Sequence, residues 1–459
     1  MISFQPIKKS DLETLKPYFP PSSRLCTKAI GVMYMWSEYC ETRIAPYEGG
    51  VLFKDDWLGF PLFRVPKGEN AETGFALIEE YLRARGEDIV FHTLDDEDLA
   101  LLSARYPVIE IKSRRDNDDY LYLASDLAEY KGKKYHGQRN FRNRFFSTYP
   151  NHTFAPFGAE DLPEIYAFLE EHKALAPRSK EELNEYECCR RLLDAMEELP
   201  LLTAVLRVDG KIVAMGVGEK LGDTLIIHIE KALASYVGVY PTFCSLFASF
   251  YGKDVTYINR EDDAGDPGLR ISKTQYNPVE MLPKRMAVCH LSRPLSLETI
   301  FTDRLVIDSF AASDMNAYAA LATDEERNRY WGYDYKIDLG SDEPNAAHFA
   351  RVLVEDEGRG VCYSRKIEDY EGNFVGEAVL YNFRLDGSAE LGLRVSGDKA
   401  GKGYGREAYR AVAEEALRLL PALHARCFKA NARSKKMILA AGFSLVREDD
   451  EMYYFKRTR

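Results

Sequence analysis

Residues 400–405 read Ala400-Gly401-Lys402-Gly403-Tyr404-Gly405, between a strand-like stretch and an amphipathic helical stretch. The first turn of a helix leaves backbone N–H groups unpaired and carries the positive end of the helix dipole, so it can hold a phosphate group. Glycine lets the backbone approach a ligand closely because it has no Cβ atom. This stretch therefore predicts an anion site made from backbone groups.

Two common phosphate-binding loops do not fit this stretch. A P-loop requires Ser or Thr directly after Gly-Lys, but Gly403 follows Lys402. The dinucleotide-binding fingerprint requires its third glycine at the position of Arg406. Neither nucleotide-binding motif is therefore predicted here.

The residues on both sides of the loop predict a helix that lies on a sheet. After the loop, apolar residues recur every four positions, which gives one apolar stripe: Tyr404, Ala408, Val412, Ala416 and Leu420. Before the loop, apolar and polar residues alternate over 389–395, which predicts a strand with one buried face. Further along, Asn431 is expected to cap a helix that ends at Gly442.

Several short motifs follow in one order from about residue 299 to the end: Thr302-Asp303-Arg304-Leu305, Ala389-Glu390-Leu391-Gly392-Leu393-Arg394, the glycine loop, Asn431-Ala432-Arg433-Ser434 and Gly442-Phe443. This region resembles the GNAT acyltransferase superfamily, in the branch of the ribosomal-protein N-terminal acetyltransferases. Gly403 and Gly405 match its acetyl-CoA pyrophosphate loop, whereas Ala400 stands where Arg or Gln is usual.

The resemblance implies that acetyl-CoA is a co-substrate and assigns its binding to a set of residues: Leu393, Arg394, Val395, Ala400, Gly401, Lys402, Gly403, Tyr404, Gly405 and Asn431. It makes Glu390 and Glu377 candidates for the general base and Ser434 the candidate for the general acid. The alternatives are an exposed strand carboxylate, a cross-strand pair and simple helix capping. Tyr453 and Tyr454 are further proton-donor candidates, although packing of an edge strand also explains them.

Residues 1–290 contain a longer motif. Asn259-Arg260-Glu261-Asp262-Asp263 is followed by Gly268-Leu269-Arg270, and then by Lys273 and Tyr276. This region resembles the soluble C-terminal domain of phosphatidylglycerol lysyltransferases. The resemblance implies two divergent GNAT-like halves, at about 1–145 and 146–290, and relatives that move an amino acid from aminoacyl-tRNA onto a lipid or a peptide. Residues 291–459 then form the GNAT domain, after a joint at 289–297.

The second of these halves has the strand pattern of such a module but lacks the glycine loop. Asp209-Gly210 predicts a hairpin turn between strands at 201–208 and 211–219. A further strand at 224–230 leads to a helix at about 240–251 through Tyr236-Val237-Gly238-Val239. We therefore expect no CoA pyrophosphate site in this half.

The charged residues of the longer motif suit a polar substrate that carries an amine together with a carboxylate or phosphate. Arginine can grip an oxyanion with two hydrogen bonds, and a carboxylate can hold an ammonium group. The candidates for substrate binding are Arg260, Glu261, Asp263, Arg270 and Lys273. The alternative is a buried ion network that fixes the loop after a strand.

A dense basic run occupies residues 131–144, from Lys131 to Arg144, and includes Tyr135 and Phe141. Such a run can bind tRNA phosphates and stack a base. A helix with a solvated cationic face has the same composition. The two interpretations stay open at the level of sequence.

Composition limits the function further. The chain has 459 residues, which favours two or three modules, and its formal charge of −12 disfavours general binding to nucleic acid or anionic membranes. Eight cysteines without a Cys-x-x-Cys pair suggest neither a metal site nor a disulfide framework. With no signal peptide and no membrane-length apolar run in the sequence, we expect a cytoplasmic protein without integral membrane association.

The sequence thus predicts an α/β (α+β) protein of three GNAT-like modules, with mixed sheets flanked by helices. The C-terminal module is expected to acetylate an amine of a small molecule or a peptide, beside an aminoacyl-transferase-like N-terminal region. One alternative is an aminoacyl-tRNA-dependent transferase with a lipid or peptide acceptor and possible tRNA contacts at residues 131–144. The other is a non-catalytic sensor of acyl-CoA or an amino acid.

Overall fold

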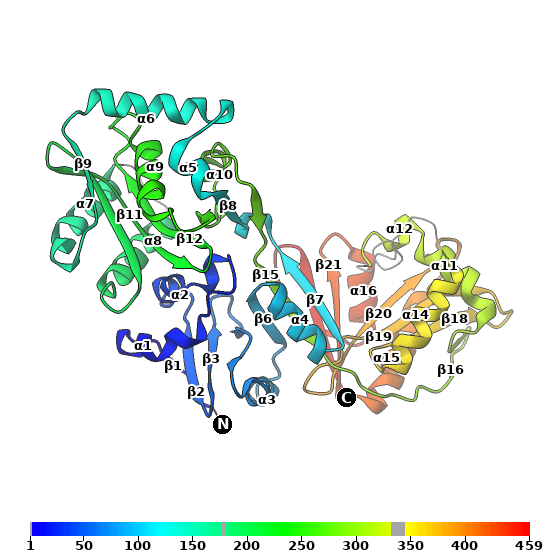
Figure 1. Ribbon diagram of the computed structural model, residues 1–459. Helices are drawn as coiled ribbons and strands as arrows, with labels where there is room; N and C mark the ends of the chain where they lie inside the picture. The colour runs from blue at the N-terminus through cyan, green and yellow to red at the C-terminus, as the bar shows by residue number, and fades with distance from the viewer. Residues whose placement is uncertain (1, 176–179, 332–344) are drawn as a thin grey trace. The chain divides into compact units, whose positions relative to one another are not determined.

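The computed structural model describes residues 2–175, 180–331 and 345–459 (Figure 1). Its strands form three mixed sheets flanked by helices, which confirms the predicted α/β class with GNAT-like modules. The chain has two compact units. One unit comprises Met1–Tyr81, Val90–Leu101 and Glu110–Val288, and the other comprises Leu82–Ile89, Leu102–Ile109 and Cys289–Arg459.

The first sheet has the strand order β1-β2-β3-β4-β6-β15-β7, with β5 paired to β3. Its strands are β1 (Gln5–Pro6), β2 (Arg43–Tyr47), β3 (Gly50–Asp55), β4 (Leu62–Phe63), β5 (Lys67–Gly68), β6 (Ile89–Leu94), β7 (Val108–Ser113) and β15 (Arg285–His290). The helices among them are α1 (Leu12–Leu15), α2 (Ile30–Trp36), α3 (Ala71–Arg83) and α4 (Asp96–Arg105), with short 3-10 turns such as η2 (Lys16–Tyr18), η3 (Cys26–Lys28) and η4 (Arg115–Asn117).

The second sheet has the order β14-β8-β13-β12-β11-β10-β9. Its strands are β8 (Asp119–Leu123), β9 (His152–Ala155), β10 (Leu201–Val208), β11 (Lys211–Leu221), β12 (Thr224–Ala232), β13 (Tyr257–Asn259) and β14 (Glu280–Leu282). The helices are α5 (Ala124–Glu129), α6 (His136–Thr148), α7 (Leu162–Ala174), α8 (Lys180–Asp194), α9 (Val239–Tyr251) and α10 (Pro267–Thr274). The predicted hairpin is confirmed, because Asp209 and Gly210 both have positive φ between β10 and β11.

The third sheet has the order β16-β17-β18-β19-β20-β21-β23-β22. Its strands are β16 (Ile300–Phe301), β17 (Leu305–Asp308), β18 (Cys362–Asp369), β19 (Phe374–Tyr381), β20 (Ala389–Val395), β21 (Ala422–Phe428), β22 (Ser444–Glu448) and β23 (Met452–Thr458). The helices are α11 (Met315–Ala322), α12 (Glu325–Asn328), α14 (Ala346–Gly358), α15 (Tyr404–Leu419) and α16 (Ala432–Ala440).

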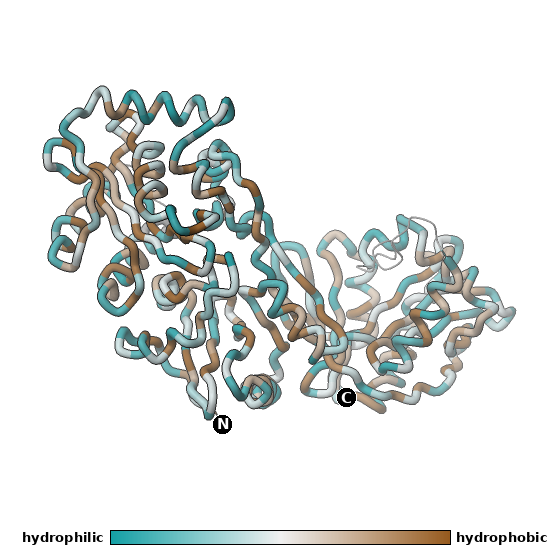
Figure 2. Tube along the Cα trace, in the orientation of Figure 1, coloured by the Kyte–Doolittle hydropathy of each residue, from teal (hydrophilic) through white to brown (hydrophobic). Residues whose placement is uncertain are grey.

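The first two sheets share one apolar cluster, in which buried residues of α2 and β3 pack with residues of β10, β11 and β12, whereas the third sheet packs with its own helices. In the third sheet the predicted stripe of α15 is buried at Ala408, Val412 and Ala416, where it packs with Leu391 of β20. Figure 2 shows the contrast between apolar strands and helices such as α6, which is coloured largely hydrophilic. The helices are therefore held mainly by the apolar faces that they turn toward the sheets.

One local arrangement occurs three times: a strand, a helix and a parallel partner strand. The strands pair at Phe63 and Phe91 in β4 and β6, over residues 224–226 and 257–259 in β12 and β13, and over residues 389–390 and 423–424 in β20 and β21. In each case one strand continues beyond the paired residues, so the two strands separate. The ends of parallel strands that separate in this way commonly hold ligands in open α/β sheets.

The sheets divide residues 1–290 at a different place from the expected boundary. Residue 145 lies inside α6, whereas the chain passes from the first sheet to the second between β7 and β8. This division follows from pairing, because β8 lies between β13 and β14. Farther on, β15 returns to the first sheet, and the second unit resumes within this strand, at Cys289.

Candidate functional site

The glycine loop in the C-terminal module forms the start of α15, as predicted. Gly401 and Gly403 have φ angles of +80° and +85°, and Gly403 occupies the N-cap position of α15. L-residues with side chains rarely adopt this conformation, so the backbone itself requires glycine. A Cβ atom on Gly405 would lie 3.3 Å from Val395 and 3.6 Å from Leu393, which shows that this glycine allows close packing of α15 on β20.

Arg304 brings a positive charge to this loop, and the sequence analysis missed it. Its Nη1 donates to the carbonyl of Lys402 at 3.0 Å, and its guanidinium lies 4.7 Å from the ring centroid of Tyr404. Glu407 accepts from Arg304 Nε at 2.7 Å and neutralises part of the charge. Arg304 belongs to the quoted Thr302-Asp303-Arg304-Leu305 motif, but nothing in the sequence places that motif beside the loop.

The two candidate bases lie on one face of neighbouring strands. Residue pairing places Glu377 opposite Arg394 and Tyr381 opposite Glu390, so all four side chains share the face away from Leu391 and α15. Glu390 is buried, accepts from Tyr381 Oη at 2.8 Å and forms an ion pair with Arg426 at 2.9 Å.

Glu377 is buried in a second ion pair. It accepts from Ser364 Oγ at 2.7 Å and from Arg394 Nε at 2.7 Å. Arg394 also contacts Asn328 and lies 4.7 Å from the ring of Trp331. The alternating polar residues of β20 are therefore on the expected face, but this face is covered rather than exposed.

Asn431 and Ser434 lie together at the start of α16. Asn431 Oδ1 accepts from the backbone N–H of Ser434 at 3.2 Å, which confirms Asn431 as an N-cap. Tyr454, one of the further proton-donor candidates, donates to Asp449 at 2.7 Å. Burial and this hydrogen bond raise the pKa of Tyr454 to about 12, which makes it a weaker acid.

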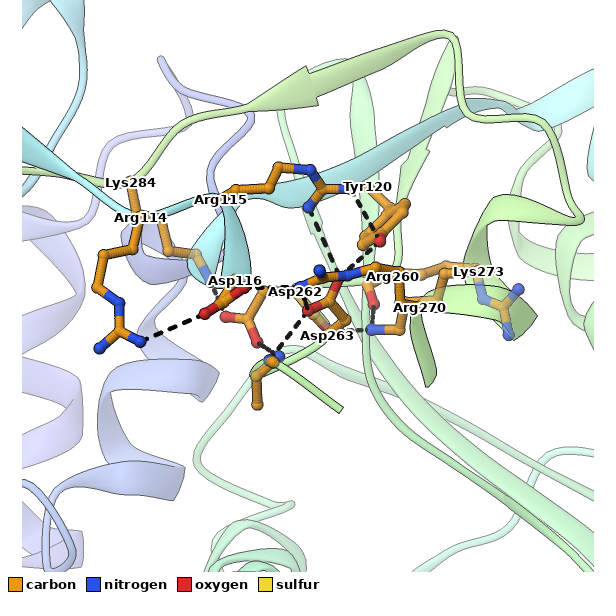
Figure 3. A network of polar contacts seen from close by, with 12 residues as sticks. Arg114, Arg115, Asp116, Tyr120, Arg260, Asp262, Asp263, Arg270, Lys273 and Lys284 are labelled. Carbon is orange, nitrogen blue, oxygen red and sulfur yellow. Dashed lines mark hydrogen bonds and ion pairs between the residues drawn. The ribbon is translucent and has the colours of Figure 1, made fainter. Parts of the chain in front are cut away.

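Of the five candidates in the N-terminal region, Asp263 and Arg270 form one ion network (Figure 3). Asp263 accepts from Tyr120 Oη at 2.6 Å and from Arg270 at 2.8 and 2.9 Å. Arg270 also donates to Asp116 at 2.7 Å. The hydrogen bond from Arg270 holds the pKa of the Asp263 carboxyl well below its usual range. These contacts fix the segment after β13 against β8 and η4, which is the structural alternative considered above.

Arg260 and Lys273 have different partners. Arg260 Nη2 donates to both oxygens of Glu230 at 3.0 Å, and the guanidinium lies 4.6 Å from the ring of Tyr276. Its Nη1 is buried and has no hydrogen-bond partner among the described residues. Lys273 Nζ donates to the carbonyls of Arg260 and Asp262, while burial and the charge of Arg260 lower the pKa of the lysine.

Glu261 belongs to a buried group that the sequence analysis did not assemble. Its carboxylate lies 3.1 Å from His228 Nδ1, and Glu219 lies 3.3 Å from His228 Nε2. Burial opposes the charged form of His228, but the hydrogen bonds with Glu219 and Glu261 outweigh it and raise the pKa to about 9. The same Glu219 accepts from the backbone N–H of Gly31 in α2 at 2.9 Å.

A second buried group lies beside the first. Asp119 accepts from Asn259 Nδ2 at 2.9 Å and from the backbone N–H of Cys26 at 2.8 Å, and it forms an ion pair with Lys284 at 2.7 Å. Lys284 also pairs with Asp262 at 2.5 Å. The motif thus joins η3, β8 and β13 into one polar region, and four of its members were not identified from sequence: His228, Glu219, Asp119 and Lys284.

The basic run forms part of α6 and the turn before it. Tyr135 is fully buried and donates to the carbonyl of Tyr276 at 3.0 Å, so its ring is not accessible to stack a base, which was one of the two open interpretations. Arg139 donates to the carbonyls of Tyr130 and Gly132, and Lys134 pairs with Asp126 at 2.9 Å. These contacts favour a structural role for several of the cations. Phe141, by contrast, is 52% exposed.

Within residues 2–175, 180–331 and 345–459, no group of three or more His, Cys, Asp or Glu side chains is placed to hold a metal ion. In the same residues no helix combines the length and the apolar character that a bilayer crossing requires.

The chain is similar to known proteins in two separate parts, one N-terminal and one C-terminal. A family model described as acetyltransferase (GNAT) domain matches residues 304–444. A crystal structure of a conserved protein of unknown function from Bacteroides thetaiotaomicron is 28% identical, with a TM-score of 0.55 over 63% of this chain and 100% of that one. No curated protein matches the chain.

Two further solved structures have lower TM-scores. The L-PGS structure from Bacillus licheniformis is 19% identical, covers 63% of this chain and 94% of its own, and has a TM-score of 0.44. Spermidine N-acetyltransferase from Vibrio cholerae, solved with CoA and spermine, is 13% identical, covers 34% and 96%, and has a TM-score of 0.31.

The GNAT domain and the lysyltransferase-like domain are both of acyltransferase type, as the sequence predicted. The model described as phosphatidylglycerol lysyltransferase, C-terminal, matches residues 22–288, which is more than half of the chain. The matched residues include the ion network of Asp263 and Arg270, the group around His228, and the group around Asp119 and Lys284. The chain therefore belongs to the phosphatidylglycerol lysyltransferase C-terminal family, with a GNAT domain after the matched region.

Proposed function

We propose that the C-terminal module transfers an acetyl group from acetyl-CoA to the amine of a small molecule or a peptide. The observation that carries this proposal is the start of α15, where two left-handed glycines precede a helix beside the separating strands β20 and β21. Unpaired N–H groups and the helix dipole there suit a diphosphate. Acetyl-CoA supplies the activated acyl group.

The residues of the module take separate roles in this proposal. Backbone groups of residues 400–405 hold the diphosphate, and Arg304 adds the cation that Ala400 lacks. Backbone groups of Leu393, Arg394 and Val395, together with Asn431, align the pantetheine arm. Each of these assignments rests on position around the start of α15.

Glu390 is the proposed base, because it is the last residue of β20 that pairs with β21 before the strands separate. It accepts the proton of the attacking amine, directly or through water, while the C–S bond of the thioester breaks. Ser434 at the start of α16 donates a proton to the leaving thiolate as the amide N–C bond forms; the serine then regains a proton from solvent, and Glu390 releases its proton to solvent. Glu377 holds Arg394 through the ion pair of 2.7 Å and so positions β20.

Calorimetry with acetyl-CoA tests the proposal directly. We expect Gly403→Glu in the full chain to weaken binding by at least about 100-fold, roughly 3 kcal/mol, because a carboxylate then occupies the place of the diphosphate. Gly372→Glu is a matched control, since Gly372 has φ of +79° and no neighbour within 4 Å of its Cβ position. Equal affinity of the two variants would show that the diphosphate lies elsewhere. Binding without release of free thiol over a panel of amines would instead favour the sensor alternative.

We also propose aminoacyl transfer for the N-terminal region, on the basis of its family membership. In this proposal Glu261 holds the ammonium group of the amino acid and Arg260 faces its acyl or phosphate group, while Asp263, Arg270 and Lys273 fix the loop that carries them. Transfer of a labelled amino acid from aminoacyl-tRNA to lipid or peptide is the test. Glu261→Gln should abolish transfer, while Glu197→Gln, at an exposed glutamate outside the motif and the basic run, serves as the control. Transfer that survives Glu261→Gln would contradict this role.

A further inference from the structure

The first sheet contains a pocket at the place where β4 and β6 separate. The strands pair at Phe63 and Phe91, after which Arg64 N–H donates to the carbonyl of Phe53 at 3.2 Å and keeps its segment beside β3. Strand β6 meanwhile continues to Leu94. The pocket opens between the two segments, and its lining includes Phe19, Thr27, Phe53, Arg64, Lys67 and Asp95.

Arg64 is the central polar group of this pocket. Its Nη1 donates to the carbonyl of Thr27 at 3.0 Å, and its guanidinium lies about 6 Å from the rings of Phe19 and Phe53 (6.0 and 5.9 Å). Its Nε is buried and has no hydrogen-bond partner among the described residues, and the same holds for Thr27 Oγ1. A buried donor without an acceptor costs about 1–3 kcal/mol, so these two atoms are the groups to which a bound ligand would supply acceptors.

The charges around the pocket favour an anion. Lys28 pairs with Asp95 at 3.5 Å and with Asp98, and Lys67 pairs with Asp98 at 2.8 Å. Two carboxylates thus balance two lysines. Arg64 forms no ion pair with a carboxylate of the described residues; Asp55 interacts with its charge only at longer range and pairs with His92 at 3.0 Å, so the guanidinium can still pair directly with an anion.

The wall of the pocket includes a strained residue. Thr93, near the end of β6, has φ of +56°, a conformation that a β-branched residue rarely adopts. Such strain costs about 1–3 kcal/mol and persists where the surrounding structure imposes it, often at ligand sites. The strained backbone of Thr93 is therefore a third feature of the pocket wall, after the two unpaired polar atoms, that packing alone does not explain.

We propose that this pocket binds a small oxyanion, a carboxylate or a phosphate monoester, that is attached to an apolar or aromatic body. Arg64 Nε and the Thr27 hydroxyl donate to the oxyanion, and the rings of Phe19 and Phe53 contact the body. The site lies in the first sheet, so the bound molecule is distinct from the acetyl-CoA proposed for the glycine loop. It is a second ligand at a corresponding place in another module.

Calorimetry on the full chain tests this site with phenyl phosphate, 3-phenylpropionate and the uncharged 3-phenylpropanol. The Gly403→Glu background removes any contribution from the glycine loop. We expect one or both anions to bind, and the alcohol to bind at least 10-fold more weakly. The stronger of the two anions identifies the oxyanion as phosphate or carboxylate.

Two variants assign the binding to the pocket. Arg64→Gln should weaken the preferred anion at least 10-fold, whereas Arg83→Gln, at an exposed arginine at the end of α3, should leave it unchanged. Thr27→Val should weaken it about threefold, and it decides the matter if Arg64→Gln does not fold. The proposal is wrong if neither anion binds at millimolar concentration, or if binding survives the variants that fold.

Discussion

In the second and third modules, corresponding helices begin at a glycine with the same backbone conformation. The start of the helix is covered by other backbone in the second module and accessible in the third. Gly238 at the start of α9 has φ of +81°, and Gly403 at the start of α15 has φ of +85°. A Cβ atom on Gly238 would lie 2.2 Å from the carbonyl oxygen of Phe141 in α6, whereas one on Gly403 would first meet the flexible end of Arg304 at 3.3 Å. A glycine at a helix start therefore indicates a ligand site only where no other backbone covers it.

The strands beside these helices also correspond. In the third module Glu390 pairs with Arg426 on the parallel partner strand β21, and in the second Glu230 pairs with Arg260 directly after β13. The second module also contains His228, which lies between the carboxylates of Glu219 and Glu261. The covered module thus has a buried histidine between two carboxylates, whereas the open one has the glycine loop at the start of α15.

The largest effect that sharpens this comparison is expected from Gly238→Ala. The added methyl group must displace the α6 backbone at Phe141, and the left-handed φ adds strain, for a total cost of about 3 kcal/mol. Hydrogen exchange in β11 and β12 should rise accordingly, without a change in acetyl-CoA affinity. Gly372→Ala, with the same sign of φ and open space around it, should show the strain without the clash. Equal exchange in both variants would mean that α6 does not cover the start of α9.

The next effect concerns Arg304. Arg304→Gln should weaken acetyl-CoA binding about 10-fold, near 1.4 kcal/mol, because it removes the cation and leaves Glu407 unpaired near the diphosphate. The double variant with Glu407→Gln should recover part of this loss. Arg410→Gln on the exposed side of α15 is the control, and titration calorimetry is the measurement. Full affinity in Arg304→Gln would restrict the site to backbone groups.

The pH dependence of His228 is the third test. Its pKa is raised in the folded chain, so its charged interactions stabilise fully below the unfolded value of about 6.5 and are lost as pH rises through about 9. The difference in melting temperature between the wild type and His228→Gln should therefore shrink between pH 7 and pH 10. His136→Gln, at an exposed site in α6, should show no such trend. A constant difference would mean that His228 is neutral when folded.

Much of the fold was readable because local patterns and tertiary packing agree. The four-residue stripe of α15, the Asp209-Gly210 turn and the Asn431 cap each depend on contacts within a few residues. The expected boundary at about residue 145 differs from the observed division between the sheets. The polar surface pattern of α6 does not show which sheet this helix belongs to, and no local signal shows that β8 pairs with β13.

By itself the sequence determined where the glycine loop lies and which family motifs the chain contains, because glycine conformations and helix periodicity are properties of neighbouring residues. Only the tertiary structure decided which charges meet. Arg304 lies 98 positions before Lys402, and Glu219 reaches Gly31 across 188 positions. Strand pairing and helix packing bring such residues together, so the pairs cannot be predicted from the sequence of either segment alone.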